Sequence, residues 1–96
     1  MTKAKFLVDR DALLNESSAE TASTCVSLFD RIQGLPKSRQ LMGLACAFAL
    51  MCDASGLQPQ DVFSASRNLM ADRMTTSGMK PHFEAMKFHL STDILA

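Results

Sequence analysis

The fold depends most on one apolar stretch, residues 41–52, which runs Leu41-Met42-Gly43-Leu44-Ala45-Cys46-Ala47-Phe48-Ala49-Leu50-Met51-Cys52. It is shorter than the roughly 20 residues that cross a bilayer as a helix. It is also apolar on every side, which is typical of a helix surrounded by other polypeptide. Either the remaining segments wrap this helix, or part of it forms a subunit interface.

Turn-forming residues on both sides of this stretch divide the chain into segments of helical length. Breaks are expected at 34–36, 55–59 and 75–81, where glycine, proline and small polar residues gather. The segments between them predict four main helices, at about 18–33, 38–54, 59–73 and 81–94. Residues 6–14 are ambiguous, and we expect a short strand-like arm there that leads into a helical turn from Asp9.

Local signals support these boundaries. Ser17 and Glu20 fit a capping box at the start of the first helix. Gly34 is expected to end that helix in the left-handed conformation, and Gly56 to end the second. Pro59 fits the first turn of the third helix.

The sequence therefore predicts a single all-α domain over residues 1–96: a compact bundle of about four helices around a central hydrophobic helix, with a short N-terminal arm. The 47% hydrophobic content is enough for one core and argues against intrinsic disorder. The first helix carries its apolar residues as one stripe, whose members are Ala22, Cys25, Val26, Phe29 and Ile32.

Charge and motif content exclude several classes of function. Ten Lys and Arg balance ten Asp and Glu, so the positive surplus of a nucleic-acid or anionic-membrane binder is missing. There is no nucleophile elbow and no glycine-rich phosphate loop, since the four glycines are isolated. We expect no enzyme activity, no catalytic residue and no cofactor.

Cysteines and histidines do not suggest a metal site. Cys25, Cys46 and Cys52 fall within helical apolar patterns, where we expect buried, reduced thiols. His82 and His89 are seven residues apart, which places them about 10 Å apart along a helix, too far for both to bind one zinc ion. We expect ordinary surface or partly buried histidines.

One alternative to a protein-binding role is DNA binding through a helix-turn-helix with its turn at 55–59. The spacing of a small residue, Gly56 and an aliphatic residue matches that motif. The side chains facing the major groove would be Gln58, Gln60, Ser64 and Arg67. Asp61 and the zero net charge oppose this alternative, because electrostatic attraction supplies most non-specific DNA affinity.

Methionine content points to a protein-binding surface. Four methionines cluster around the third break, beside a loop of residues 75–78 that is too polar to cover them. Arginine and methionine are both enriched at interfaces. The predicted partner-binding residues are Arg67, Met70, Arg73, Met74 and Met79.

Residues 56–72 (Gly56-Leu57-Gln58-Pro59-Gln60-Asp61-Val62-Phe63-Ser64-Ala65-Ser66-Arg67-Asn68-Leu69-Met70-Ala71-Asp72), followed by Phe83-Glu84-Ala85, resemble small helical accessory proteins of tailed bacteriophages. The resemblance implies a protein made during infection that binds and modulates a host protein, for example as an inhibitor. We therefore expect a non-catalytic protein–protein interaction protein, forming a homodimer and located in the cytoplasm, that of the host if it is phage-encoded. No membrane partner is expected.

Overall fold

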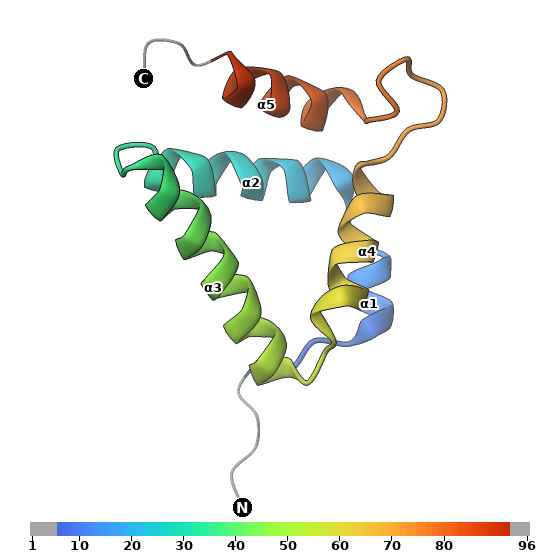
Figure 1. The fold of residues 1–96 in the computed structure, drawn as a ribbon. Coiled ribbons are helices and arrows are strands. Elements are labelled where there is room, and N and C mark those ends of the chain that lie inside the picture. Colours follow the sequence, from blue (N-terminus) through green and yellow to red (C-terminus); the bar gives the residue numbers. More distant parts are fainter. Residues whose placement is uncertain (1–5, 93–96) are drawn as a thin grey trace, which may run out of the picture.

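The computed structural model describes residues 6–92, which form five α-helices and no strand (Figure 1). Their bounds are α1 Arg10–Leu14, α2 Ser18–Ile32, α3 Lys37–Ser55, α4 Pro59–Met70 and α5 Pro81–Ser91. The all-α prediction is confirmed. Each of the four predicted main helices is present, at α2 to α5.

The N-terminal arm leads into a helical turn, as predicted. Asp9 is the N-cap of α1, and its carboxylate accepts a hydrogen bond from the backbone N–H of Asp11 at 3.1 Å. At the far end, the amide of Asn15 donates to the carbonyl of Asp11 at 2.8 Å. These local bonds hold a helix of five residues that has no buried side chain of its own.

Helix α2 begins at the predicted cap but ends differently. The Ser17 hydroxyl accepts from the backbone N–H of Glu20 at 3.2 Å. The expected left-handed glycine at Gly34 is wrong, because positive φ angles occur only at Gly56 and Gly78 among the described residues. Instead the side-chain amide of Gln40 donates to the carbonyl of Leu35 at 2.7 Å, which ties the end of α2 to the start of α3.

The turn from α3 to α4 follows the prediction. Gly56 has φ of 78°, and its N–H donates to the carbonyl of Cys52 at 2.9 Å. A side chain with a Cβ is disfavoured there, since this region is strained for L-residues other than glycine. Pro59 then opens α4, whose axis lies at 116° to that of α3.

Two boundaries near the C-terminus differ from the sequence prediction. Helix α4 ends at Met70 rather than at Arg73, because Ala71 becomes extended and pairs with Met79 in an antiparallel bridge. Helix α5 ends at Ser91, with Thr92 as its C-cap. Ile94, which was predicted to belong to the last helix, lies outside the described residues.

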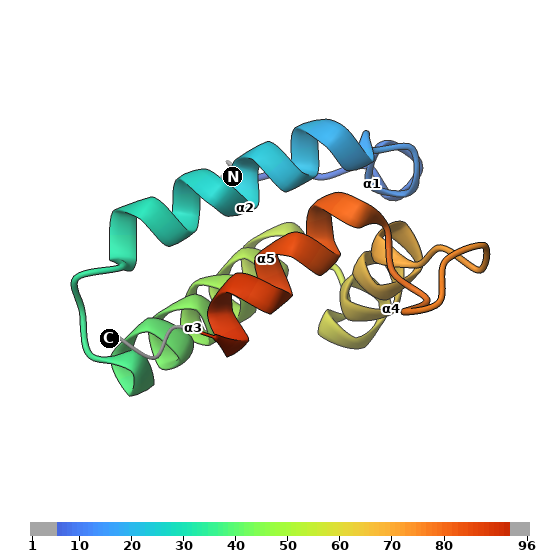
Figure 2. The same cartoon turned by 90° about the horizontal axis from the view of Figure 1, so that it is seen from above.

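The helices follow a roughly triangular outline (Figure 1). α2, α3 and α4 form its three sides, α5 packs along α2, and α1 packs against α4 (Figures 1 and 2). The Cα radius of gyration is 15.0 Å, against about 12.5 Å for a close-packed chain of this length. Among the described apolar side chains, only Ala22, Cys52 and Phe83 are buried.

Helix α3 is therefore not wrapped by the rest of the chain. Leu41, Met42, Leu50 and Met51 are all exposed, whereas Cys52 is buried. The sequence allowed two arrangements for α3: wrapping by the other segments, or a subunit interface. Wrapping is wrong, because the triangular arrangement of the helices leaves most of α3 without a neighbour. No single helix of the described chain is long and apolar enough to cross a bilayer, and α3 and α4 meet that criterion only together, across their 116° bend.

Candidate protein-binding site

The connection between α4 and α5 is an ordered hairpin-like loop, residues 71–80. The N–H of Asp72 donates to the carbonyl of Gly78 at 2.9 Å, and the N–H of Lys80 donates to the carbonyl of Met70 at 2.8 Å. Gly78 makes the turn possible with φ of 75°. These bonds hold the two ends of the loop together.

Polar side chains inside the loop satisfy its own backbone. The Asp72 carboxylate accepts from the N–H of Met74 at 2.9 Å. The Thr75 hydroxyl lies 3.1 Å from the carbonyl of Asp72 and 3.0 Å from that of Met79, so it can donate to either. Because Asp72 and Thr75 are turned inward, the Met74 side chain lies outside this network and is 93% exposed.

The structure brings three of the five predicted partner-binding residues to one hollow. Arg67, Met70 and Met79 line a surface depression of about 320 Å³ together with Lys87 of α5. Met74 lies in the adjoining loop, and Arg73 beside it is exposed. We call these predicted residues, Arg67, Met70, Arg73, Met74 and Met79, the methionine surface.

The charges along this hollow have one sign. Among residues 6–92, Arg67 and Lys87 line it, and no carboxylate does. The guanidinium of Arg67 lies 5.7 Å from the centre of the Phe63 ring, so that a cation–π contact orients it. Lys87 is not among the predicted residues, because the pattern of α5 alone does not show that its middle lies beside the loop.

A second depression continues the first along α5. It measures about 270 Å³ and shares Ser77, Met79 and Lys87 with its neighbour. Phe88 is 68% exposed there, and among the described lining residues Glu84 adds a carboxylate. The two depressions together give a surface of mixed character, in which Met70, Met79 and Phe88 lie beside Arg67 and Lys87.

The three cysteines occupy three different environments. Cys52 is buried and Cys25 is half-buried, and burial raises the pKa of the Cys25 thiol. Cys46 is exposed on α3, so the expectation of a buried thiol there is wrong. The cause is again the lack of a helix over that side of α3.

His82 and His89 are both exposed on α5, in agreement with the expectation of surface histidines. Within residues 6–92, no group of three or more His, Cys, Asp or Glu side chains is placed to hold a metal ion.

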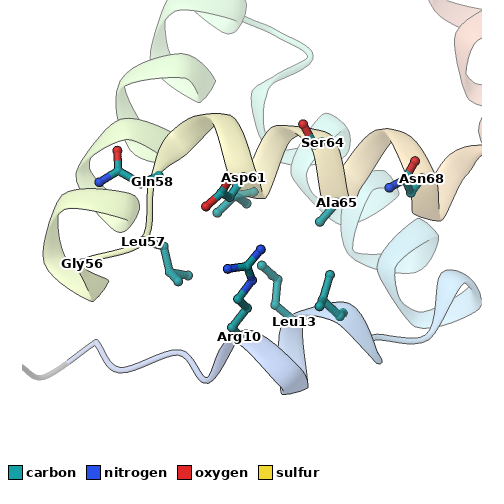
Figure 3. Close-up of a pocket in the computed structure, with 11 residues that line it drawn as sticks. Arg10, Leu13, Gly56, Leu57, Gln58, Asp61, Ser64, Ala65 and Asn68 are labelled. Atoms are coloured by element: carbon teal, nitrogen blue, oxygen red, sulfur yellow. The ribbon is translucent and has the colours of Figure 1, made fainter.

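A further hollow, between α1 and α4, was not found from the sequence (Figure 3). It measures about 330 Å³, and the Arg10 side chain extends into it from α1 toward Asp61 of α4. Leu13 and Leu57 supply apolar lining. The ambiguous pattern of residues 6–14 gave no reason to place α1 against α4.

The geometry of the α3–α4 turn is compatible with a helix-turn-helix. Its 116° angle lies within the range of about 90–120° found in that motif. The four side chains that would face DNA are all exposed: Gln58, Gln60, Ser64 and Arg67. Asp61, in the first turn of the same helix, is exposed as well.

Comparison of the chain with protein-family models, with curated proteins and with solved structures gave no match.

Proposed function

We propose that this protein acts in the cytoplasm by binding another protein, without catalysis, and that the methionine surface is where it binds. The observation that carries the proposal is Met74, an apolar side chain 93% exposed on a loop that hydrogen bonds hold in place. Such a side chain gains from burial in a partner's pocket and loses little conformational freedom of the backbone on binding.

The charges beside Met74 indicate what the partner offers. Arg67 and Lys87 line the adjoining hollow, and no carboxylate of the described part of the chain joins them, so a partner segment with an acidic side chain beside an apolar one complements it. The resemblance of residues 56–72 to phage accessory proteins suggests a bacterial host protein as this partner, which binding would modulate.

The test uses immobilised protein and a bacterial lysate treated with nuclease, followed by the purified partner. Replacing Met74 and Met79 with Glu should weaken binding at least tenfold by calorimetry, since buried anchor residues contribute most of the affinity. Met51→Glu is the matched control, because Met51 is exposed on a different helix. This variant should bind the partner as the unaltered protein does. If the Met74/Met79 double variant captures the partner as well as Met51→Glu does, with helicity unchanged by circular dichroism, the methionine surface is not the binding site.

DNA binding is the second candidate, favoured by the 116° angle between α3 and α4. It predicts a shift of duplex DNA that weakens steeply with salt and is lost in Arg67→Ala. A protein-binding role predicts no shift at physiological salt. Since Asp61 lies beside the groove-facing positions and the net charge is zero, the protein-binding proposal is preferred.

A further inference from the structure

One side of α3 carries an exposed stripe with opposite charges at its two ends. Its positions recur at spacings of three and four residues, so they share one face of the helix. The members, all exposed, are Arg39, Met42, Cys46, Ala49, Leu50 and Asp53. Met42 and Leu50 are the large apolar members, 64% and 67% exposed.

The opposite side of the same helix faces the protein from Leu44 onward. Leu44 and Phe48 are half-buried and Cys52 is buried, at four-residue steps, whereas Leu41, at the start of that side, is exposed. Figure 1 shows α3 as one side of the triangular outline, and no other described helix lies beyond its outer side. Because every member of the stripe is exposed, it is free to meet another molecule.

The stripe is complementary to itself when two copies run antiparallel. Cys46 is its midpoint: Arg39 and Asp53 are each seven residues away, and Met42 and Leu50 are each four residues away. A two-fold axis beside Cys46 would set Arg39 against Asp53 of the second copy, twice, and Met42 against Leu50, twice. A parallel pair would instead oppose like charges at both ends.

We propose that a second copy of this chain docks on this stripe, forming an antiparallel α3–α3 pair with its two-fold axis at Cys46. The dimer goes beyond the proposed function, because it uses a different helix from the methionine surface. It leaves Arg67 and Met74 on each copy free for a partner.

Small residues lie beside the two-fold axis of this pairing. Gly43 and Ala49 face each other in this register, and their small size lets the two helices approach closely.

The first test compares two identical substitutions on opposite sides of α3. Leu50→Glu should convert the dimer to a monomer in light scattering after size-exclusion chromatography at about 100 µM, because it sets a carboxylate in the apolar part of the stripe. Leu41→Glu is the control: position 41 is nine residues away, on the opposite side of the helix, and exposed, so this variant should remain dimeric. Monomeric unaltered protein at this concentration overturns the proposal, as does a dimer in both variants.

The second test addresses the register. Arg39→Asp and Asp53→Arg should each weaken the dimer at least fivefold by sedimentation, because each sets two like charges side by side in both halves of the interface. The double variant should restore affinity to within about twofold, since the pairs are then reversed and again opposite in sign. A double variant weaker than both single variants overturns the antiparallel register.

The third test uses the thiol on the axis. Mild oxidation should give a dimer linked through Cys46 to Cys46, identified by peptide mass spectrometry, because the pairing brings these two positions together. Leu50→Glu should reduce this product at least tenfold, whereas Leu41→Glu should not. A product formed equally in the unaltered protein and in Leu50→Glu would reflect random collision and would overturn the proposal. Folding of every variant is followed by circular dichroism, and capture of a partner is measured separately.

Discussion

The α2–α5 pair and α3 use similar apolar residues but bury them to different degrees. In α2 the apolar side chains form one stripe, and the protein provides one neighbour, α5, along which it packs; Ala22 and Phe83 are buried in these two helices. In α3 apolar side chains lie all round; Cys52 is buried, but the large side chains of Leu41, Met42, Leu50 and Met51 are exposed. A helix with one stripe needs one neighbour, whereas α3 needs several, and a chain of this length does not supply them.

Phe83→Ala should produce the largest loss of stability. The ring is 5% exposed in α5, and truncating a buried phenylalanine costs about 3–5 kcal/mol. A domain of this size has a total stability of only about 5–14 kcal/mol, so a large part of it would be lost. Urea unfolding followed by circular dichroism measures the change.

Phe88→Ala is the matched control on the same helix. Its ring is 68% exposed, so the free energy of unfolding should change by less than about 0.5 kcal/mol. Equal losses in the two variants would show that α5 does not pack through Phe83, and the contrast between the α2–α5 pair and α3 would disappear.

Thr21→Val should have an intermediate effect of the opposite sign. The Thr21 hydroxyl of α2 is buried without a hydrogen-bond partner within the described chain. Valine has the same shape without the polar group, and its helix propensity is similar, so the variant should gain about 1 kcal/mol. Thermal unfolding should shift upward by about 4–8 °C.

Thr24→Val controls for the change of residue type. The Thr24 hydroxyl is exposed and donates to the carbonyl of Glu20 at 3.0 Å, so its replacement should leave the melting temperature nearly unchanged. If Thr21→Val also leaves it unchanged, water reaches that hydroxyl and the α2–α5 pair is looser than its burial indicates.

Local chemistry predicted the helices well. The Ser17 cap, the left-handed Gly56 and the prolines that open α4 and α5 act within a few residues, so the sequence alone identifies them. The bond from the Gln40 side chain to the Leu35 carbonyl, just after α2, and the Ala71–Met79 bridge that ends α4 join residues five and eight positions apart through one side chain and one backbone pairing. Helix propensity does not describe such contacts.

The sequence placed several members of the candidate site close together but did not show what surrounds them. Composition placed Met70, Met74 and Met79 near one loop, and the structure brings Met70 and Met79 to one hollow with Arg67. Lys87 comes from the following helix, and its position depends on how α5 packs along α2. Likewise, an apolar run predicts that α3 needs cover, but not whether the cover comes from this chain or from another.

Leu41→Ala should change stability least, and it tests the exposure of α3 directly. Leu41 is 73% exposed and lies on the opposite side of the helix from the proposed dimer stripe. Its truncation should cost less than about 0.5 kcal/mol in urea unfolding at low and high protein concentration, because little apolar area is lost and alanine is the best helix former. If the rest of the chain wrapped α3, Leu41 would be buried, and its truncation to alanine would lower the free energy of unfolding by about 2–5 kcal/mol. A cost in that range, independent of protein concentration, would mean that α3 is covered by the rest of the same molecule.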